Sequence, residues 1–161
     1  MSNKQSIEIL PIGIVTTDVA DDDVARQRRT MVSEIQIFEE YAAGLKGIEE
    51  YSHIIVLFWM HRVDRSPRQL VHPRGDPSLP LTGVLASRGR GHPNPIGFAV
   101  AELIARDGPR LTVRRLDAYH GTPVIDVKPY DQYDVCIELR TPQWFSEQLA
   151  RKRSTDAQSS G

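Results

Sequence analysis

The length of its apolar runs is the feature that most constrains what this chain can fold into. The longest run, Ile54–Met60, has seven residues, which suits a strand and falls far short of the roughly 20 residues that a membrane span needs. Short segments rich in β-branched residues alternate with Gly, Pro and Asp-Gly turn signals about every eight to twelve residues. No internal repeat and no strand–Gly-rich turn–helix unit interrupts this pattern. It predicts an all-β barrel or sandwich.

Strands are expected wherever apolar residues alternate with polar ones or run together. These segments are residues 7–15, 32–38, 51–61, 83–87, 96–105, 111–116 and 124–127. One short helix is predicted over residues 39–45, closed by Gly44 or Gly47. Asp107-Gly108 predicts a hairpin turn. Residues 17–23 read as a polar loop, and residues 62–80, rich in proline and arginine, as a long irregular segment of the kind that often forms a functional loop.

Charge is distributed unevenly along the chain. Residues 62–115 hold ten arginines, no lysine and four acidic residues, whereas residues 1–61 hold five basic and ten acidic residues. Residues 116–161 hold five basic and seven acidic residues. An arginine-rich middle segment inside a chain of net charge −1 indicates a candidate anion-binding face, because the planar guanidinium suits phosphate and carboxylate. Arginines scattered over a solvated surface would give the same count.

Other features narrow the class of protein. A single cysteine, Cys136, excludes an internal disulfide framework and any multi-cysteine zinc site. The N-terminus lacks an apolar signal core, so a cytoplasmic location is expected and no membrane contact. Residues 1–6 and 151–161 read as a flexible N-terminus and a frayed, solvated tail.

The sharpest local motif is the segment Ser87–Gly97 (SRGRGHPNPIG). Its glycines let backbone amides approach a ligand closely, and Arg88, Arg90 and His92 can supply charge. The segment fits neither the P-loop nor the dinucleotide fingerprint. A ligand-binding loop and a plain solvent-exposed connection both remain open.

A second candidate is the segment Asp117–Pro123 (DAYHGTP). Asp117 could accept hydrogen bonds from hydroxyls or an ammonium group, while Gly121 and Pro123 set a tight turn. The alternative is a turn selected only for its backbone geometry.

Five histidines invite a metal or acid–base interpretation: His53, His61, His72, His92 and His120. No pair has the i,i+4 spacing of a helical metal site. His53 and His61 would lie roughly 26 Å apart on one strand, too far to share an ion. We therefore expect no metal centre and no serine hydrolase.

Several motifs in chain order resemble the TsaA/TrmO family (also called YaeB- or VirR-like). They are Ile12–Val15, Ala25–Gln27, Gly47–Ile54 with Phe58–His61, Gly83–Arg88, His92–Gly97 and Gly121–Tyr130. The blocks Pro-Asn-Pro-Ile-Gly and Gly-Thr-Pro-Val-Ile-Asp-Val-Lys-Pro-Tyr are highly specific in combination. The resemblance runs from about residue 7 to residue 140.

The resemblance implies a fold, a cofactor and partners. The fold is a mostly β protein, a small antiparallel β-barrel over residues 7–140 with one or two short helices, followed by a C-terminal extension and tail over 141–161. The cofactor is S-adenosylmethionine, bound near the interface of a homodimer. The activity of the best-known members is N6-methylation of threonylcarbamoyladenosine next to a tRNA anticodon.

By motif position, the resemblance also implies the residues of the cofactor site. They are Arg26, Gln27, His61, Arg62, Arg88, Phe98, Asp117, Ala118, Tyr119 and His120. The chain departs from the family pattern at several of these motifs: Ala25 stands where proline is usual, Gly89-Arg90 where Ser-Pro is usual, and His92 and His120 where arginine and aspartate are usual. These departures bear more on substrate identity than on cofactor binding.

The chemistry of the cofactor suggests roles for some of these residues. Phe98 and Tyr119 suit an adenine slot, Asp117 a hydroxyl acceptor, and Arg26 or Arg88 the carboxylate. Methyl transfer is a direct displacement, so no covalent enzyme intermediate is required. A base would help a weakly nucleophilic acceptor nitrogen, and His53, His61 and His120 are candidates among which the sequence does not choose.

Three functions are compatible with these motifs. The first is a tRNA adenosine methyltransferase, for which Arg65, Arg68 and Arg74 in the proline-rich segment are the candidate RNA contacts. The second is a small-molecule methyltransferase, favoured by the altered loop and by the absence of the further C-terminal domain that many tRNA-modifying members carry. The third is a non-catalytic module that senses S-adenosylmethionine, allowed by the replacements at His92 and His120.

Overall fold

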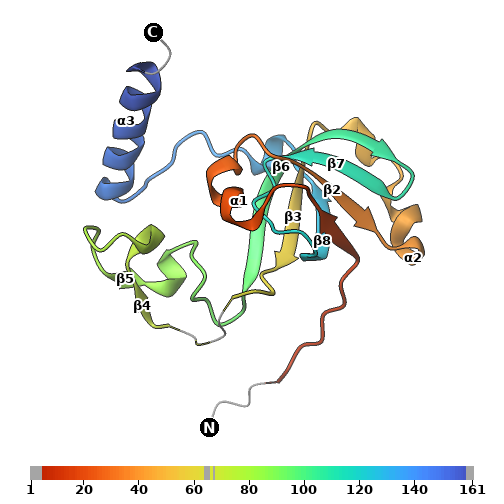
Figure 1. Ribbon diagram of the computed structural model, residues 1–161, viewed down its shortest axis with the longest axis horizontal. Helices are drawn as coiled ribbons and strands as arrows, with labels where there is room; N and C mark the ends of the chain where they lie inside the picture. The colour runs from red at the N-terminus through yellow and green to blue at the C-terminus, as the bar shows by residue number, and fades with distance from the viewer. Residues whose placement is uncertain (1–4, 64–65, 67, 159–161) are drawn as a thin grey trace.

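Six antiparallel strands close into a barrel in the order β1-β2-β7-β6-β3-β8 (Figure 1). The computed structural model describes residues 5–63, 66 and 68–158, with side chains up to Arg151. The strand bounds are β1 Gly13–Thr16, β2 Val32–Ile37, β3 His53–Trp59, β6 Ile96–Asp107, β7 Arg110–Arg114 and β8 Pro123–Pro129. The predicted fold class, a mostly β protein built on a small antiparallel barrel, is confirmed.

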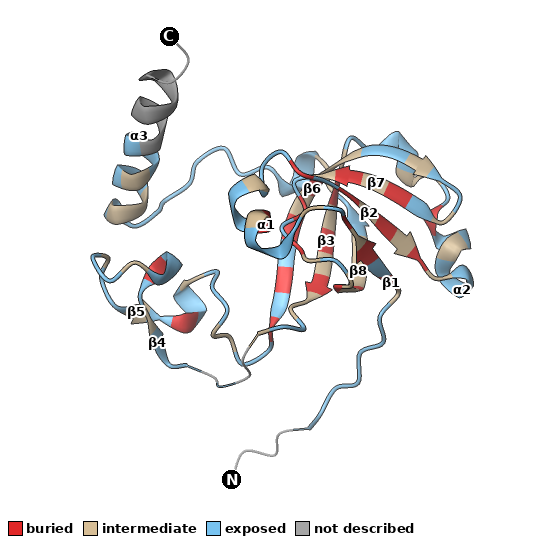
Figure 2. Cartoon of the chain, in the orientation of Figure 1, coloured by how far each residue is buried: buried red, intermediate tan, exposed pale blue. Residues whose placement is uncertain are grey.

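Alternation along the strands builds the core. In β3, Ile54, Val56 and Phe58 are buried, and the residues between them are half-buried. Inward residues of the other strands complete one apolar cluster inside the barrel, and Figure 2 shows the buried residues concentrated along the strands. Burying one large aliphatic or aromatic side chain contributes about 1.5–3 kcal/mol, so this single cluster is the main source of the barrel's stability.

Gly97 is required by a close approach between β3 and β6. It faces Phe58 in the register of the two strands, and the Phe58 ring occupies the space that a Cβ at position 97 would fill. The glycine of the Pro-Asn-Pro-Ile-Gly motif therefore lets a large aromatic side chain cross to the neighbouring strand inside the barrel.

The β6–β7 hairpin forms where Asp107-Gly108 predicted it. Asp107 pairs with Arg110, and Gly108 has a φ of +57°, in the left-handed region that glycine adopts without steric cost. The long partner strand β6 carries an irregularity between Leu103 and Ala105, where the register with β7 shifts. The hairpin prediction is confirmed.

Two of the expected strands are wrong in part. The strand predicted over residues 7–15 begins only at Gly13, and Ile7, Ile9 and Leu10 are exposed. Pro11 has no N–H to donate, so the ladder begins with Ile12, whose N–H donates to the carbonyl of Val124 at 2.8 Å.

The strand predicted over residues 83–87 reduces to β5 (Thr82–Gly83), which pairs with β4 (Leu70–Val71) in a separate two-stranded sheet. A 3₁₀ turn follows at Val84–Ala86. Ser87 closes this turn twice, since its N–H and its hydroxyl both donate to the carbonyl of Val84, at 3.0 and 2.8 Å. These local hydrogen bonds replace the ladder bonds of a strand.

Helix α1 (Asp21–Gln27) occupies part of a region expected to be a polar loop, so that prediction is wrong there. Three aspartates fill its first turn, where negative charge interacts favourably with the helix dipole. The helix predicted over residues 39–45 is confirmed: it forms as α2 (Glu39–Ala42), continued by a 3₁₀ turn at Ala43–Leu45. Gly47, with φ at +89°, separates that turn from the next.

Helix α3 (Gln143–Gln158) is a further correction, because a frayed tail was expected from residue 151. It begins just after Pro142 and has a Gln143–Glu147 hydrogen bond of 2.8 Å along one face. In Figure 1 it lies beside the β4–β5 sheet and away from the barrel. The part of the predicted tail at 159–161, like most of the predicted flexible segment 1–6, lies outside the described residues.

Within the described residues, no helix combines the length and apolar character required to cross a membrane.

Candidate functional site

Strand directions gather the loops with the expected site residues at one end of the barrel. β1 ends and β8 begins there, because Ile14 pairs with Pro123. β3 ends and β6 begins at the same level, because Trp59 pairs with Ile96. The segments 17–31, 60–95 and 115–122 therefore begin and end at this end of the barrel, although they are far apart in sequence.

Arg62 connects these three segments. Its guanidinium donates to the carboxylate of Asp21 on α1 and, at 3.3 Å, to the carbonyl of His120. It also lies over the Tyr119 ring, 5.3 Å from the ring centroid, at cation–π distance. A single side chain thus joins α1, the end of β3 and the 117–121 loop.

The Arg88 and Phe98 side chains form a second arginine–aromatic pair. The Arg88 guanidinium lies 5.4 Å from the Phe98 ring centroid and donates to the Phe98 carbonyl at 3.2 Å. Phe98 is 47% exposed although it belongs to a barrel strand, so its ring is available on the surface. Arg90 connects the two pairs, since it donates to the Tyr119 hydroxyl at 3.3 Å.

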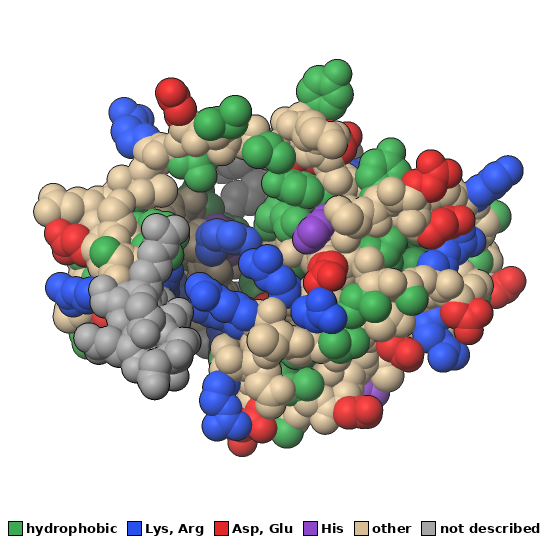
Figure 3. Space-filling model, turned by 90° about the horizontal axis from the view of Figure 1, so that it is seen from above, with side chains coloured by type: hydrophobic (Ala, Val, Ile, Leu, Met, Phe, Trp, Pro, Cys, Tyr) green, Lys and Arg blue, Asp and Glu red, His purple; other side chains and the backbone are tan. Residues whose placement is uncertain are grey.

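We call Arg62, Arg88, Phe98, Arg90 and Tyr119 the arginine–aromatic cluster. Figure 3 shows Lys and Arg side chains gathered around a hollow near the middle of the face seen from above. Three cationic groups against two aromatic rings can bind a planar ring and an anionic group side by side. The family resemblance did not assign Arg90 to the cofactor site. The sequence of its loop had nevertheless indicated that Arg90 can supply positive charge to a ligand.

His61 and His120 border the cluster and have different hydrogen bonds. Nε2 of His61 accepts from Nε–H of Arg62 at 3.2 Å, so the ring proton of a neutral His61 lies on Nδ1. Nδ1 of His120 lies 3.4 Å from the amide nitrogen of Thr17 and 3.2 Å from its carbonyl oxygen. One tautomer of His120 therefore accepts from Thr17 and the other donates to it.

His53 lies at the opposite end of β3. It pairs with Glu102 in the ladder, its Nδ1 lies 2.9 Å from the Ser52 hydroxyl, and its ring meets that of Tyr130 at a centroid distance of 6.4 Å. The structure therefore does not bring His53 together with the other two candidate bases.

The backbone is conformationally constrained at Arg115, just before the 117–121 loop. Arg115 has a φ of +72°, an uncommon conformation for a residue with a side chain, and its N–H donates to the carbonyl of Met31 at 3.1 Å. Ala118 is 3% exposed and belongs to the core cluster, so it helps to hold the loop against the barrel and offers little surface to a ligand. Asp117 is exposed, and within the described part of the chain its carboxylate has no hydrogen-bond or ion-pair partner.

Arg26 and Gln27 come from the end of α1. Arg26 makes an ion pair of 2.6 Å with Asp23 on its own helix, and its side chain is 75% exposed. Gln27 uses its backbone carbonyl to end the helix, accepting from the N–H groups of Thr30 and Met31 at 2.8 Å. Arg26 and Gln27 lie at the same end of the barrel as the cluster. Among the described interactions, neither residue contacts it directly.

The two candidate RNA contacts that the structure describes, Arg68 and Arg74, make contacts with different parts of the chain. Arg65 lies outside the described residues. The backbone N–H of Arg68 donates to the carbonyl of Gly91 at 3.2 Å, so Arg68 lies beside the 87–97 loop. Arg74 instead contacts α3: it donates to Gln148 at 2.6 Å and lies 5.4 Å from the Phe145 ring centroid.

A cavity lies apart from the cluster. It measures about 560 Å³ and lies between residues 76–80 and the first turns of α3, with Trp144 and Arg151 in its wall. None of the residues expected to bind the cofactor lines it. Among the described residues, no group of three or more His, Cys, Asp or Glu side chains could hold a metal ion.

The fold and the cluster define a class: a small closed β-barrel with arginine and aromatic side chains gathered at one end. Residues 20–135 match the family described as the tRNA-methyltransferase O N-terminal domain, and the chain belongs to this family. The resemblance inferred from the motifs is thereby confirmed.

Individual relatives agree with this assignment. An S-adenosyl-L-methionine-binding protein of Archaeoglobus fulgidus is 43% identical over 130 residues, which are 79% of this chain and 91% of that protein. The human tRNA (adenine(37)-N6)-methyltransferase is 36% identical over 118 residues, 71% of this chain and 25% of the human protein. A crystal structure of TrmO from P. aeruginosa superposes with a TM-score of 0.71 at 26% identity, covering 89% of this chain and 63% of that one.

The chain spans less than two thirds of several of these proteins. It covers 32% of a second A. fulgidus relative, named a probable S-adenosyl-L-methionine-binding protein, to which it is 43% identical over 122 residues. Family membership therefore concerns the barrel, and the activity of the longer proteins is a separate question.

Proposed function

We propose that this protein is an S-adenosylmethionine-dependent methyltransferase that N6-methylates threonylcarbamoyladenosine in tRNA, next to the anticodon. The observation that carries the proposal is the arginine–aromatic cluster at the loop end of a barrel of this family. Two relatives support its two halves, one named for binding S-adenosyl-L-methionine and one for methylating adenine 37 of tRNA.

The cluster suits the parts of this cofactor. An arginine beside an aromatic ring can bind the carboxylate of the methionyl end while the ring packs against adenine. The carboxylate of Asp117 is a suitable acceptor for the ribose hydroxyls. In the present structure Arg88 covers Phe98 and Arg62 covers Tyr119, so adenine would stack either on the opposite ring face or on a guanidinium plane.

Positioning of the two substrates would account for most of the rate acceleration. Transfer of the methyl group needs the acceptor nitrogen in line with the sulfonium, and the protein contributes by holding both substrates in that geometry. Of the three candidate bases, His61 and His120 border the cluster. Nε2 of His61 already accepts from Arg62, whereas the His120 tautomer that donates from Nδ1 to Thr17 has its Nε2 available to accept a proton, which favours His120.

The test is incubation of the protein with methyl-labelled S-adenosylmethionine and total tRNA from the source cell, followed by nucleoside analysis. Label in N6-methylated threonylcarbamoyladenosine is the expected result. The matched control is the Arg88→Ala variant, which should transfer little label at the same cofactor concentration. Label in another nucleoside would correct the substrate, and no label in any nucleoside despite cofactor binding would refute the RNA activity.

The second candidate is methylation of a small molecule. It is favoured by the position of Arg74, whose guanidinium contacts α3 and so does not join the other arginines in one RNA-binding face. Transfer to metabolites of a cell extract depleted of RNA, with none to tRNA, would support it. Cofactor binding without transfer to either pool would favour the sensing module.

We further propose that the active unit is a homodimer in the cytoplasm. The apolar side chains of residues 51–61 pack largely inside the barrel, because β3 alternates buried and half-buried residues. This segment therefore leaves little apolar surface for a second subunit to cover. A stronger reason is the run of exposed apolar side chains at Val135 (53%), Ile137 (94%) and Leu139 (74%), because exposed apolar side chains that gather in one segment can mark an interface. Light scattering at micromolar concentration should give twice the monomer mass, and a monomer mass with the cofactor present would contradict the dimer.

A further inference from the structure

Asp21 is connected to the candidate cofactor site although no sequence motif assigned it a role. It is the first residue of α1, and its carboxylate accepts a hydrogen bond from the Nη1 of Arg62, 41 positions further along the chain. Within the described part of the chain, Asp21 is the one carboxylate that forms an ion pair with Arg62.

The other Arg62 contacts show what this ion pair fixes. The guanidinium also donates to the His120 carbonyl and to Nε2 of His61, and its plane lies over Tyr119. A guanidinium has a fixed fork of donors, so binding Asp21 with one nitrogen determines where the other nitrogens point. Without Asp21, the remaining partners are two neutral acceptors and a ring face, which orient a long side chain less strongly.

The same ion pair connects two parts of the site. Arg26 and Gln27 lie on α1, and Arg62, Tyr119 and His120 lie on the two loops across from it. Among the described interactions, the Asp21–Arg62 pair is the direct side-chain link from α1 to those loops. A change in this link moves both parts of a ligand site relative to each other.

We propose that Asp21 is a positioning residue for the cofactor site, which holds Arg62 over Tyr119 and keeps α1 against the 117–121 loop. This inference rests on the proposed function, because it takes S-adenosylmethionine as the ligand. It adds to the site a residue that acts through Arg62 and does not itself contact the cofactor.

The exposure of the Asp21–Arg62 ion pair allows its effect on ligand binding to be distinguished from any effect on folding. The side chains of Arg62 and Asp21 are 44% and 48% exposed, and an ion pair this accessible to water contributes little to global stability. Loss of the pair should therefore change ligand binding without an equal change in the thermal midpoint.

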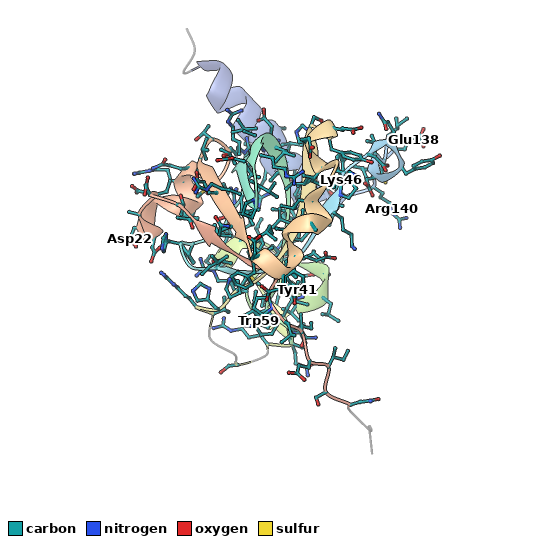
Figure 4. The ribbon with its side chains drawn as sticks, turned by 90° about the vertical axis from the view of Figure 1, so that its right-hand side faces the viewer. Asp22, Tyr41, Lys46, Trp59, Glu138 and Arg140 are labelled. Atoms are coloured by element: carbon teal, nitrogen blue, oxygen red, sulfur yellow. The ribbon has the colours of Figure 1, made fainter. Side chains whose placement is uncertain are left out.

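The chain offers a matched control in Asp22. It is the next residue of the same helical turn, it is exposed, and among the described residues its carboxylate has no hydrogen-bond or ion-pair partner. Figure 4 shows Asp22 projecting outward from the edge of the molecule. Asp21→Asn and Asp22→Asn make the same change of charge at nearly the same place, and only the first removes the ion pair with Arg62.

The experiment is a calorimetric titration of the full chain with S-adenosylmethionine. Asp21→Asn should weaken binding about 3- to 10-fold, Asp22→Asn should leave it within 2-fold of wild type, and Asp21→Glu should restore most of the loss. In the Arg62→Ala background, Asp21→Asn should cause no further loss, because the two residues then act as one unit.

Several results would overturn the inference. Unchanged binding in Asp21→Asn, equal losses in the two asparagine variants, or additive losses with Arg62→Ala each exclude a positioning role. Tighter binding in Asp21→Asn would mean that Asp21 competes with the ligand for Arg62. A wild-type protein that is folded but does not bind S-adenosylmethionine would refute the proposed function together with this inference, whereas the other results refute the inference alone.

Discussion

Single residues set the closest contacts of this barrel, and Gly97 is the clearest example. The Phe58 ring lies where a side chain at position 97 would begin, so the pair excludes any larger residue there. The next residue of the same strand, Phe98, carries its ring to the surface. A residue whose role is steric thus lies directly beside one that belongs to the arginine–aromatic cluster.

The Gly97→Ala variant tests this steric role. We expect a loss of about 1–3 kcal/mol in the free energy of unfolding, because the added methyl group forces the Phe58 ring or the backbone to move in a packed core. Urea denaturation measures it. Gly89→Ala is the control, since the nearest atom to a Cβ there is the Ser87 hydroxyl oxygen at 3.7 Å, and equal losses in the two variants would contradict the assignment.

Arg88 is the residue through which ligand affinity can be tested at the cluster. Arg88→Ala should weaken S-adenosylmethionine binding by roughly 1.5–3 kcal/mol, the usual contribution of a hydrogen bond to a charged group. Calorimetry with the folded variant measures the change. Arg110→Ala, at the hairpin end of the barrel, should bind like the wild type, and unchanged affinity in Arg88→Ala would remove Arg88 from the site.

Elements at the two ends of the barrel are held by different interactions. At the loop end, arginines contact aromatic rings and backbone carbonyls from several segments. At the hairpin end, Arg106 of β6 connects the strand to the segment before β3, donating to the carbonyl of Leu45 at 2.9 Å and to the Glu49 carboxylate at 2.8 Å. Arg106 is the less exposed partner, at 22%, so its position is the better defined of the two.

The titration of Glu49 reports on this connection between elements. Its own backbone N–H and then the Arg106 guanidinium lower the pKa of the Glu49 carboxyl below its ordinary value of 4.5. Because the pKa is lower in the folded state, the contribution to stability is present above pH 4.5 and is lost as the pH falls through the folded pKa. In Arg106→Gln the Glu49 pKa should rise toward 4.5, as measured by NMR titration.

The control for that titration is Arg114→Gln. Arg114 pairs with Glu102 on the same hairpin at 2.6 Å, so its removal takes away a similar ion pair without touching Glu49. A Glu49 titration that does not change in Arg106→Gln, or that changes equally in both variants, would show that Arg106 does not set it.

At the scale of the whole molecule, charge and shape suggest how an RNA could lie against the protein. Among the described arginines of residues 62–115, three belong to the cluster, Arg106 lies toward the hairpin end and Arg74 contacts α3, whereas α1 is acidic at its first turn. α3 lies beside the β4–β5 sheet and takes Arg74 as its partner. RNA contacts at Arg65, Arg68 and Arg74 would require a phosphate backbone that approaches the cluster from the β4–β5 side.

Replacing Arg65, Arg68 and Arg74 by alanine tests this approach. Binding of tRNA should weaken, and the slope of log affinity against log salt should flatten by up to about 0.9 for each phosphate of a duplex stem that the protein no longer neutralises. Affinity for S-adenosylmethionine should remain that of the wild type. Filter binding over a salt series measures both the affinity for tRNA and its slope, and an unchanged slope would reject this face and favour a small-molecule substrate.

How much of the molecule the sequence predicts differs between strands and helices. Strands β2, β3, β6 and β7 follow from period-two alternation and β-branched content, and the hairpin follows from Asp-Gly. Helix α1 does not follow, because its Asp-rich first turn has low helix propensity and its stability comes from dipole interactions and the burial of Val24. The region 83–87 differs from its prediction because Ser87 forms local hydrogen bonds that a pattern of apolar residues does not reveal.

In the candidate site, too, the sequence predicted some features and missed others. The family motifs named Arg62, Arg88, Phe98, Tyr119 and His120, and the structure places these five at one end of the barrel. The motifs could not indicate that Arg62 binds Asp21 or that Arg90 reaches Tyr119, because neither relation has a regular spacing. The separation of His53 from His61, in contrast, followed from their positions on one strand. The assignment of all these residues to the cofactor is still a prediction.

The sequence by itself determined an all-β barrel or sandwich, because the short apolar runs and frequent turn signals allow few other ways to bury a core. It also determined the family, because two motif blocks occur together in order, and that resemblance implied the barrel. Only the tertiary structure decided which loops share one end, since that depends on strand direction and register, which no single segment encodes. It also decided the partners of the arginines. A guanidinium binds whichever carboxylate or ring the closed barrel brings within reach, and Asp21 reaches Arg62 only after β1, β3 and β8 have paired.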